Sequence, residues 1–350
     1  MTARVALITG ITGQDGGFLA QLLLHKGYEV HGMRRRSSSA EDGHDRLDEN
    51  GLMLRVQLHY GDMTDPASII RVVRDARPHE IYNLAAQSHV KVSFENPAYT
   101  AQVNALGCLH LLEAIRLLDL IGTVRFYQAS TSELYGDTAE APQRETTAFH
   151  PRSPYAISKH FALLTTINYR EAYGLHASNG ILFNHEGKTR GESFVTRKIT
   201  RAAAAWSRGQ RKPLALGNLN AMRDWGDARD YVRGMWLILQ QEAPDDYVLA
   251  TGESRTVRQF VDAAFATVGV TVAWRGTGVN EIGVEARSGE TVVVVDPQFF
   301  RPAEVNQLVG DASRARQKLG WRPEISFERM VREMVEADIA RLRDHARTPS

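Results

Sequence analysis

The stretch that decides the fold is Val5-Ala-Leu-Ile-Thr-Gly10-Ile-Thr-Gly13-Gln-Asp-Gly16. A short apolar and β-branched run enters a glycine-rich turn, and Phe18–His25 then follows with helical spacing of its apolar residues. In this strand–turn–helix order, glycines let the backbone approach a pyrophosphate that lies at the positive end of the helix. The spacing is Gly-x-x-Gly-x-x-Gly, so an ordinary glycine-rich turn is the alternative interpretation. The stretch predicts a dinucleotide-binding turn.

Outward from this stretch, short strand patterns alternate with longer helical ones. We expect further strands over Glu29–Met33, Arg55–Tyr60, Glu80–Leu84, Arg125–Ser130 and Leu175–Phe183. We expect the helices between them over Ala67–Arg74, Tyr99–Leu117 and Pro154–Tyr173. Such alternation predicts βαβ units, and therefore an α/β fold with a Rossmann-type, doubly wound parallel sheet covered on both faces.

After about residue 185 the pattern changes to that of a smaller, mixed α/β lobe. Helices are expected over Phe194–Ser207, Asp230–Gln241, Val257–Val268, Arg314–Leu319 and Phe327–Arg343. Strands are expected over Leu214–Leu216, Tyr247–Ala250 and Thr291–Val295, and the polar Gly276–Arg287 predicts a surface loop. We therefore expect a dinucleotide-binding domain with the catalytic residues over 1–185. Residues 186–343 would be mainly a substrate-binding lobe with some segments returning to the first domain, and 344–350 a tail.

Composition narrows the class of protein. The 350 residues carry 42 Lys and Arg against 41 Asp and Glu, a net charge of +1, which argues against a nucleic-acid partner. The single cysteine, Cys108, excludes a disulfide within the chain and argues against a cysteine-based metal site. Apolar runs are too short for a membrane span, and the first ten residues do not resemble a signal peptide. We expect a cytoplasmic protein without a metal, a membrane or a nucleic-acid partner.

A basic run follows the second expected strand, where an NAD site usually has an acidic residue. The sequence there is Gly32-Met-Arg34-Arg35-Arg36-Ser37-Ser38-Ser39, without an acid. Guanidinium groups and hydroxyls suit a 2′-phosphate dianion, which favours NADP. The alternative is a solvated basic loop.

Tyr155-Ala-Ile-Ser-Lys159 lies in an expected helix that follows a strand and a loop. Residues i and i+4 share one helix face, so Lys159 could lower the pKa of the Tyr155 phenol and hold the ribose of a nicotinamide. A phenolate can then act as the general base for an alcohol that loses hydride. An ordinary surface pair is the alternative.

Ser130-Thr131-Ser132-Glu133 comes directly after an expected buried strand. The carboxyl ends of parallel strands face the ligand crevice, so Thr131 could bind a substrate hydroxyl beside the Glu133 carboxylate. Hydride transfer needs no carboxylate, but removal of a proton from carbon needs a positioned base. The alternative is a helix-capping cluster.

These stretches together resemble the extended short-chain dehydrogenase/reductase family of nucleotide-sugar enzymes. The resemblance extends over nearly the whole chain. The resemblance is carried by Gly10-Ile-Thr-Gly-Gln-Asp-Gly16, Arg35-Arg-Ser-Ser-Ser39, His59-Tyr-Gly-Asp62, Gln87-Ser-His-Val90, Phe126-Tyr-Gln-Ala-Ser-Thr-Ser-Glu-Leu-Tyr-Gly136, Pro151-Arg-Ser-Pro-Tyr155, Asn179-Gly-Ile-Leu-Phe-Asn-His-Glu186, Phe194-Val-Thr-Arg-Lys-Ile199, Arg223-Asp-Trp-Gly226 and Arg301-Pro-Ala-Glu304.

The resemblance implies roles for individual residues. The implied catalytic residues are Thr131, Glu133, Tyr155 and Lys159, with help from Ser132. The implied NADP contacts are Gly10, Ile11, Thr12, Gly13, Gln14, Asp15, Gly16, Arg35, Arg36, Ser37, Ser38, Asp62, Met63, Leu84, Ala85, Ala86, Gln87, Ser88, Tyr99, Lys159, His185 and Arg190. The implied contacts with a GDP-sugar are Ser88, Asn184, Lys198, Leu216, Arg223, Arg301 and Glu304.

The resemblance further implies a reaction on GDP-D-mannose. C4 is oxidised with tightly bound NADP, water is lost across C5 and C6, and hydride returns to C6, which forms GDP-4-keto-6-deoxy-D-mannose. A GDP-heptose as substrate remains open, as does a nucleotide-sugar 4-epimerase, which would not need Glu133. An inactive NADP-sensing regulator is the alternative from another class. A homo-oligomer, dimer or tetramer, is implied, with interface helices at Tyr99–Leu117 and Pro154–Tyr173.

The chain departs from the family at two places. After Ser39 the family usually continues Phe-Asn-Thr-Gly-Arg, whereas Ala40-Glu-Asp-Gly-His-Asp-Arg46 follows here. In the family this loop reaches a neighbouring subunit. The second departure is Asp227, which stands where the family usually has a histidine after Arg-Asp-Trp-Gly.

Overall fold

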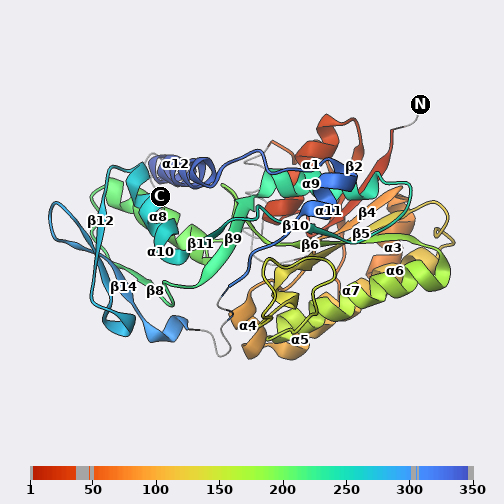
Figure 1. Ribbon diagram of the computed structural model, residues 1–350. Coiled ribbons are helices and arrows are strands. Elements are labelled where there is room, and N and C mark those ends of the chain that lie inside the picture. Colours follow the sequence, from red (N-terminus) through yellow and green to blue (C-terminus); the bar gives the residue numbers. More distant parts are fainter. Residues whose placement is uncertain (1–2, 37–46, 48–50, 301–304, 306, 346–350) are drawn as a thin grey trace.

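The protein consists of two lobes that lie side by side (Figure 1). The computed structural model describes residues 3–36, 47, 51–300, 305 and 307–345. The altered loop Ala40–Arg46 and the last residues of the expected tail, 346–350, lie outside the described residues. The larger lobe is built on a sheet between two layers of helices, and the smaller lobe contains two small sheets.

The large sheet has seven strands in the order β10-β6-β5-β4-β1-β2-β3, and every pair is parallel. Its strands are β1 (Val5–Thr9), β2 (Glu29–Arg34), β3 (Gln57–Tyr60), β4 (Glu80–Asn83), β5 (Arg125–Thr131), β6 (His176–Leu182) and β10 (Tyr247–Leu249). The chain runs outward from β1 to β3 and then returns to β4, on the other side of β1. The carboxyl ends of β1 and β4 therefore flank the switch point at which such sheets bind ligands.

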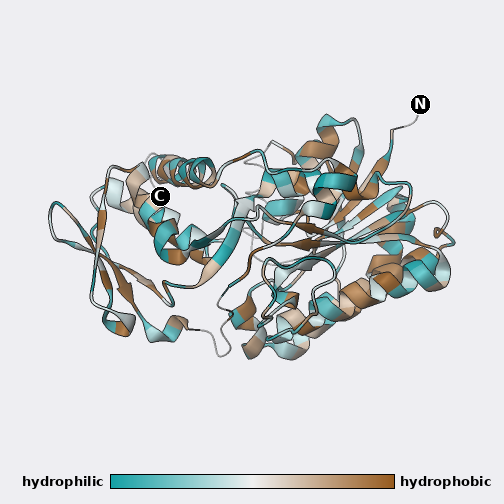
Figure 2. Cartoon of the chain, in the orientation of Figure 1, coloured by the Kyte–Doolittle hydropathy of each residue, from teal (hydrophilic) through white to brown (hydrophobic). Residues whose placement is uncertain are grey.

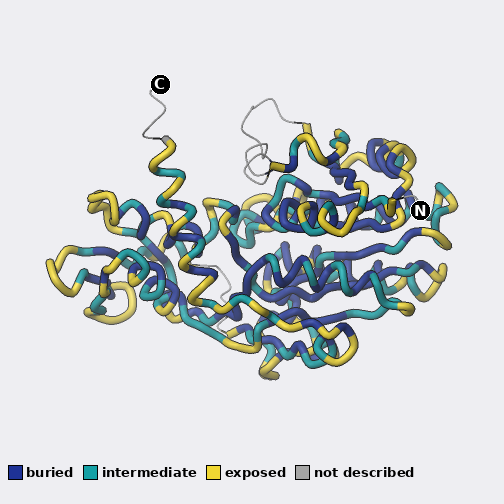
Figure 3. Tube along the Cα trace, turned by 90° about the horizontal axis from the view of Figure 1, so that it is seen from above, coloured by how far each residue is buried: buried dark blue, intermediate teal, exposed yellow. Residues whose placement is uncertain are grey.

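Helices cover both faces of this sheet (Figures 1 and 3). One face carries α1 (Gln14–His25), α9 (Ala228–Leu239) and α11 (Ser313–Leu319); the other carries α3 (Pro66–Ala76), α6 (Gly107–Leu117) and α7 (Pro154–Tyr173), with the short α4 (Val90–Glu95) and α5 (Pro97–Ala101) at its edge. Neighbouring residues of a strand point to opposite faces, so Ile8 packs with the first layer and Leu7 with the second. This arrangement confirms the predicted α/β fold with its doubly wound parallel sheet.

The smaller lobe has its own apolar core. Its sheets have the orders β11-β9-β7 and β12-β13-β14-β8. Their strands are β7 (Asn184–Glu186), β8 (Leu214–Leu216), β9 (Met222–Asp227), β11 (Ser254–Thr256), β12 (Val272–Arg275), β13 (Ile282–Glu285) and β14 (Thr291–Val295). The helices are α8 (Val195–Ser207), α10 (Val257–Thr267), α12 (Phe327–His345) and the short η3 (Gly278–Asn280) and η4 (Pro297–Phe299). Trp225, Phe260 and Val335 pack between these layers, and the strand β14 is largely hydrophobic (Figure 2).

The predicted surface loop Gly276–Arg287 is wrong, because this segment contains η3 and the strand β13. β13 pairs with β12 on one side and β14 on the other. A Cβ at Gly283 would stand 2.8 Å from Val272 Cγ1, so the strand approaches its neighbour closely where a side chain would not fit. With a glycine in place of an apolar residue, the strand lacks the alternation that would have indicated it.

The predicted helix Tyr99–Leu117 is interrupted. Between α5 and α6 lies the π-helical turn η1 (Gln102–Leu106), which widens the helix. This turn carries Asn104, whose amide accepts from Gln87 N at 2.9 Å and donates to Gln87 O at 3.0 Å. The interruption therefore holds the loop that follows β4, where ligand contacts are predicted.

Candidate active site

A cavity of about 1200 Å³ lies between the lobes. It opens at the carboxyl ends of β1, β4, β5 and β6 and is bounded on its other side by α8, β8 and β9. Its lining therefore combines the switch point of the large sheet with elements of the smaller lobe.

The glycine-rich turn forms one wall of this cavity. Gly10 has φ +69°, and a Cβ there would stand 2.9 Å from Ala85 Cα in the loop after β4. A Cβ at Gly16 would stand 2.4 Å from Gly10 O, so the first turn of α1 packs directly on the turn. No side chain caps the N-terminus of α1 at Gly13, so its first N–H groups remain available to a ligand. The turn fits a pyrophosphate.

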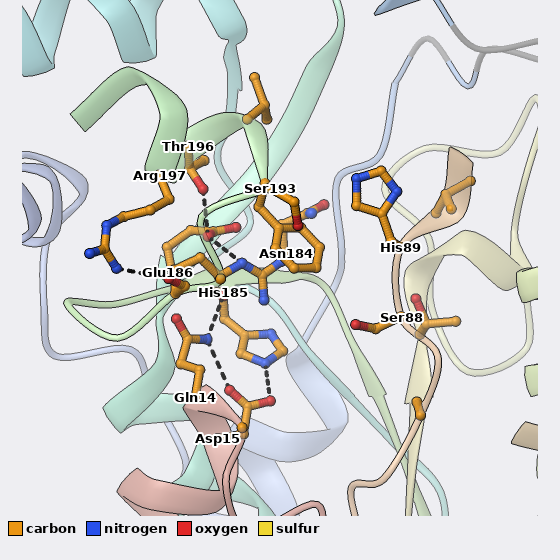
Figure 4. A pocket seen from close by; sticks show the side chains of 18 of the residues that line it. Gln14, Asp15, Ser88, His89, Asn184, His185, Glu186, Ser193, Thr196 and Arg197 are labelled. Atoms are coloured by element: carbon orange, nitrogen blue, oxygen red, sulfur yellow. Dashed lines mark hydrogen bonds and ion pairs between the residues drawn. The ribbon is translucent and has the colours of Figure 1, made fainter. Parts of the chain in front are cut away.

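A buried pair of charges joins this turn to the smaller lobe. His185 Nε2 lies 2.7 Å from Asp15 Oδ2, and His185 Nδ1 lies 2.7 Å from Phe183 O (Figure 4). Burial lowers the pKa of His185, but the Asp15 carboxylate and the Phe183 carbonyl together raise it by more, so the net shift is upward. Burial raises the pKa of Asp15, but His185, Gln14 and Arg190 together lower it by more, so its net shift is downward. The imidazole and the carboxylate therefore stabilise each other's charged forms.

Arg190 is held by a second buried carboxylate. Glu186 Oε2 lies 2.9 Å from Arg190 Nε and accepts from Thr196 Oγ1 at 2.7 Å (Figure 4). Burial raises the pKa of Glu186, and Arg190 opposes this effect. The Arg190 guanidinium also lies 3.8 Å from the centre of the Phe194 ring. These contacts fix a cation in the cavity wall beside His185.

The basic run lies at the carboxyl end of β2. Arg34 and Arg35 line the cavity, whereas Arg36 lies outside its lining. Arg35 Nη1 donates to Tyr99 Oη at 2.9 Å. The predicted contacts Ser37 and Ser38 lie outside the described residues.

Tyr155 and Lys159 both line the cavity from α7, and both are buried. Lys159 Nζ donates to Ala129 O at 2.9 Å. Burial lowers the pKa of Lys159 to about 8. Burial raises the pKa of Tyr155 to about 12, while a side-chain hydrogen bond with Thr131 acts to lower it. The expected lowering of the Tyr155 pKa is thus wrong for the protein alone, because desolvation outweighs the neighbouring groups.

Thr131, Ser132 and Glu133 line the same cavity at the end of β5. Thr131 Oγ1 accepts from Glu133 N at 3.2 Å and so caps the short helix η2 (Ser132–Leu134). The cluster therefore does both things that its sequence suggested: it caps a short helix and it borders the cavity. Glu133 therefore borders the same cavity as Tyr155.

The predicted substrate contacts gather at the other end of the cavity. Ser88, Asn184, Lys198, Leu216 and Arg223 all line it. Arg223 Nη1 donates to Met222 O and Val305 O at 2.9 and 2.8 Å, and Lys198 Nζ lies 4.8 Å from the centre of the Phe299 ring. Arg301 and Glu304 lie outside the described residues.

Several predicted cofactor contacts do not line the cavity. Thr12, Gln14, Leu84, Ala85 and Ala86 line it, but Ile11, Arg36, Asp62, Met63, Gln87 and Tyr99 do not. The Ile11 and Met63 side chains belong to the two core layers of the large sheet. Asp62 Oδ1 accepts from Thr64 N at 2.9 Å and so shapes the loop after β3. The side chains of Ile11, Met63 and Asp62 therefore support the wall of the cavity.

Several cavity residues were not predicted from the sequence, among them Lys91, Glu186 and Arg34. Lys91 Nζ donates to Gln298 O at 2.7 Å and so connects α4 with the smaller lobe across the cavity. Its place directly after the matched stretch Gln87-Ser-His-Val90 was a signal that could have indicated it. Arg34 is the first of the three arginines, and its place in the basic run is the signal that could have indicated it.

Asp227, the departure from the family, has a structural role. Its Oδ1 accepts from Arg229 N at 2.9 Å, which caps α9. The Arg229 guanidinium then lies 2.7 Å from Asp227 and 2.6 Å from Glu333 of α12. The aspartate thus connects α9 with the C-terminal helix.

Two kinds of feature are absent from the described ranges. No group of His, Cys, Asp and Glu side chains in them is arranged to hold a metal ion. No helix in them is long and apolar enough to cross a membrane.

Comparison with known proteins gives close relatives over almost the whole chain. The family model for GDP-mannose 4,6 dehydratase matches residues 7–334. The GDP-mannose 4,6-dehydratase of Sinorhizobium fredii (strain HH103) is 59% identical over 343 residues, which cover 97% of this chain and 98% of that protein. The GDP-mannose 4,6 dehydratase of Homo sapiens is 52% identical over 344 residues, which cover 97% of this chain and 92% of that protein.

Solved structures share the fold at lower identity. The UDP-glucose 4-epimerase of Thermus thermophilus, in complex with NAD, is 26% identical, with a TM-score of 0.79 over 95% of this chain and 98% of that chain. The UDP-glucose 4-epimerase of Thermotoga maritima, with UDP-glucose, is 26% identical, with a TM-score of 0.80 over 97% of this chain and 99% of that chain.

Proposed function

The chain belongs to the GDP-mannose 4,6-dehydratase family, and from this premise we propose that it converts GDP-D-mannose to GDP-4-keto-6-deoxy-D-mannose. The observation that carries the proposal is the lining of one cavity, in which the Glu133 carboxylate, Tyr155 and Lys159 lie opposite a dinucleotide-binding turn. An oxidation at one carbon and a proton abstraction at the next need both kinds of group.

The resident cofactor of this reaction is a nicotinamide dinucleotide, and we propose NADP. When bound, it accepts a hydride from C4 of the sugar and returns a hydride to C6. The glycine turn and the uncapped start of α1 suit its pyrophosphate, and Lys159 suits the hydroxyls of its ribose. Arg35 in the lining, and the lack of an acid beside it, favour a 2′-phosphate.

Tyr155 takes the proton of the sugar 4-OH. Since burial holds its pKa at about 12, the phenol is protonated in the protein alone and needs help to become a base. Thr131 supplies a hydrogen bond that favours the phenolate. Lys159, anchored at Ala129 O, adds a positive charge on the same helix face when it is protonated.

Glu133 acts on the next carbon. A ketone at C4 acidifies the proton on C5, and a carboxylate at the end of β5 can remove it. The same carboxyl group, now protonated, can pass the proton to the C6 hydroxyl as it leaves as water, assisted by Ser132. Glu133 thus ends the loss of water in its starting, ionised form. When hydride returns to C6, C5 must take up a proton, and the overall balance closes because Tyr155 holds the proton that it took from the 4-OH.

The smaller lobe binds the nucleotide part of the substrate. Lys198 and Arg223 place positive charge in the lining where a diphosphate would lie, and Asn184 offers an amide. We propose that residues 186–343 serve mainly as this lobe, although β10 and α9 belong to the larger lobe. Residues 1–185 then hold the cofactor and the catalytic groups.

We also propose a homo-oligomer and a cytoplasmic location. Ile157, Phe161 and Leu164 of α7 are 58%, 43% and 52% exposed, and their spacing places them on one helix face. An exposed apolar stripe of this kind is typical of an interface between copies of a chain. The cytoplasmic location rests on the single cysteine, Cys108, which fits a reducing compartment.

The experiment that tests the proposal is mass spectrometry of the product from GDP-mannose without added reductant. The proposal expects a product that is lighter by one water. A product of unchanged mass would identify a 4-epimerase, which has no need of Glu133. Competition between GDP-mannose and a GDP-heptose would then decide which sugar is preferred, and GDP-mannose is expected to have the higher kcat/KM.

A further inference from the structure

The three arginines at the end of β2 do not all face the same way. β2 ends at Arg34; Arg34 and Arg36 contact one tyrosine, Tyr60, whereas Arg35 contacts another, Tyr99. β2 pairs in parallel with β3, and its register places Arg34 opposite Tyr60. Tyr60 is therefore the neighbour of two of the three arginines.

Tyr60 contacts both of these arginines. Arg34 Nη2 donates to Tyr60 Oη at 2.7 Å. The guanidinium carbons of Arg34 and Arg36 lie 4.8 and 4.7 Å from the centre of the Tyr60 ring. The ring is 44% exposed, so its contacts with the arginines are not a by-product of core packing.

The Tyr60 backbone is itself held in place. Arg71 Nη2 of α3 donates to Tyr60 O at 3.0 Å. Beyond the end of β2, Arg35 Nη1 donates to the hydroxyl of a second tyrosine, Tyr99. The three arginines are thus supported by two tyrosines.

Such support changes how the arginines meet a ligand. Neighbouring guanidinium groups repel one another, and each long side chain loses rotamer freedom when it binds a phosphate. A cation over an aromatic ring is attracted to it, and a side chain that is already ordered loses less freedom on binding. Arg34, which lines the cavity beside Arg35, is therefore already placed for an anion.

We propose that Arg34 is a further cation for the 2′-phosphate and that Tyr60 is the positioning residue that holds Arg34 toward it, with Arg36 stacked on the same ring. The proposal rests on the proposed use of NADP and adds the residues that set its preference over NAD. The ring of Tyr60 carries both arginines, and its hydroxyl adds a contact with Arg34 alone.

The test uses 2′,5′-ADP and 5′-AMP, the adenosine parts of NADP and NAD. They differ only in the 2′-phosphate, which 2′,5′-ADP carries. Their dissociation constants are measured by calorimetry on the full chain after nucleotide removal, for the unaltered protein, Tyr60→Leu, Tyr60→Phe and Arg34→Leu. Arg211→Leu is the matched control, because Arg211 lies 4.5 Å from the Trp206 ring in the smaller lobe, outside the cavity lining. Melting temperatures show whether each variant folds.

We expect Tyr60→Leu and Arg34→Leu to weaken 2′,5′-ADP about 3- to 10-fold and to leave 5′-AMP within about twofold. Tyr60→Phe keeps the ring and should retain most of the affinity, and Arg211→Leu should bind like the unaltered protein. The inference is overturned if Tyr60→Leu binds 2′,5′-ADP normally, if it weakens both fragments equally, or if Tyr60→Phe is as weak as Tyr60→Leu. An unaltered protein that binds both fragments equally would instead overturn the proposal of NADP itself.

Discussion

Asp15→Asn removes one charge from the buried pair that connects the glycine turn with the smaller lobe. The two atoms of the pair are 2.7 Å apart, and the side chains of His185 and Asp15 are only 11% and 23% exposed. Breaking a buried pair by removing one partner costs about 3–5 kcal/mol. Asparagine keeps a hydrogen bond, and solvent screens part of the interaction, so we expect about 1–3 kcal/mol here.

The pH dependence of the lost stability shows whether the charge pair between Asp15 and His185 is its cause. In the folded protein the pKa of His185 lies above its ordinary value of 6.5, so its contribution to stability is complete below that pH and is lost as pH rises through the raised value. The pKa of Asp15 lies below its ordinary value of 3.8, so its contribution is present above that value and is lost in acid. The stability lost in Asp15→Asn should therefore be largest at about pH 5 to 6.5 and should shrink toward about pH 9.

The assay is the melting temperature of the unaltered protein and of Asp15→Asn at each pH, recorded at one scan rate. A difference of a few degrees is expected near pH 6. Asp75→Asn is the control, because the Arg74–Asp75 pair is 59% and 46% exposed and should contribute little. A difference that stays constant with pH, or grows in alkali, would refute the charge pairing.

Four further outcomes are expected. Gly16→Ala places a Cβ 2.4 Å from Gly10 O and should lower the melting temperature and release bound nucleotide, whereas Gly122→Ala meets nothing within 4 Å and should do neither. Lys159→Met should lower kcat about 10²-fold or more, measured as product formed from GDP-mannose at fixed times. An unchanged kcat would contradict the role of Lys159 in stabilising the Tyr155 phenolate. Phe161→Glu should reduce the particle mass in light scattering, and an unchanged mass would locate the interface elsewhere. Glu133→Gln should abolish the keto product, read by mass spectrometry, while bound nucleotide remains; full activity would exclude Glu133 as the base.

The sequence was most informative where function depends on local geometry. The turn from Gly10 to Gly16 follows from the order of strand, glycines and helix, and the Tyr155–Lys159 pair follows from helix periodicity. The end of β5 was recognisable because the pattern of a buried strand ends directly at the cluster Thr131-Ser132-Glu133. In each case neighbours in sequence are also neighbours in space.

The sequence was least informative where partners come from far along the chain. The strand β9 was missed because it contains buried charges, and Asp224 accepts from Thr251 N, Gly252 N and Gly310 N, far away in sequence. Glu186 and Arg190 look like an ordinary i,i+4 surface pair, and only the tertiary structure buries them in the cavity wall. The pKa of Tyr155 was mispredicted for the same reason, since desolvation depends on all surrounding segments.

The measurement that tests the central claim most directly follows one hydrogen atom. GDP-mannose that carries deuterium at C4 is incubated with the protein without added reductant, and the product is analysed by NMR and mass spectrometry. If Tyr155 and Glu133 act on adjacent carbons around one resident cofactor, the product has lost water and carries the deuterium at C6. A product that keeps its C6 oxygen, or that has lost the deuterium to solvent, would contradict the account.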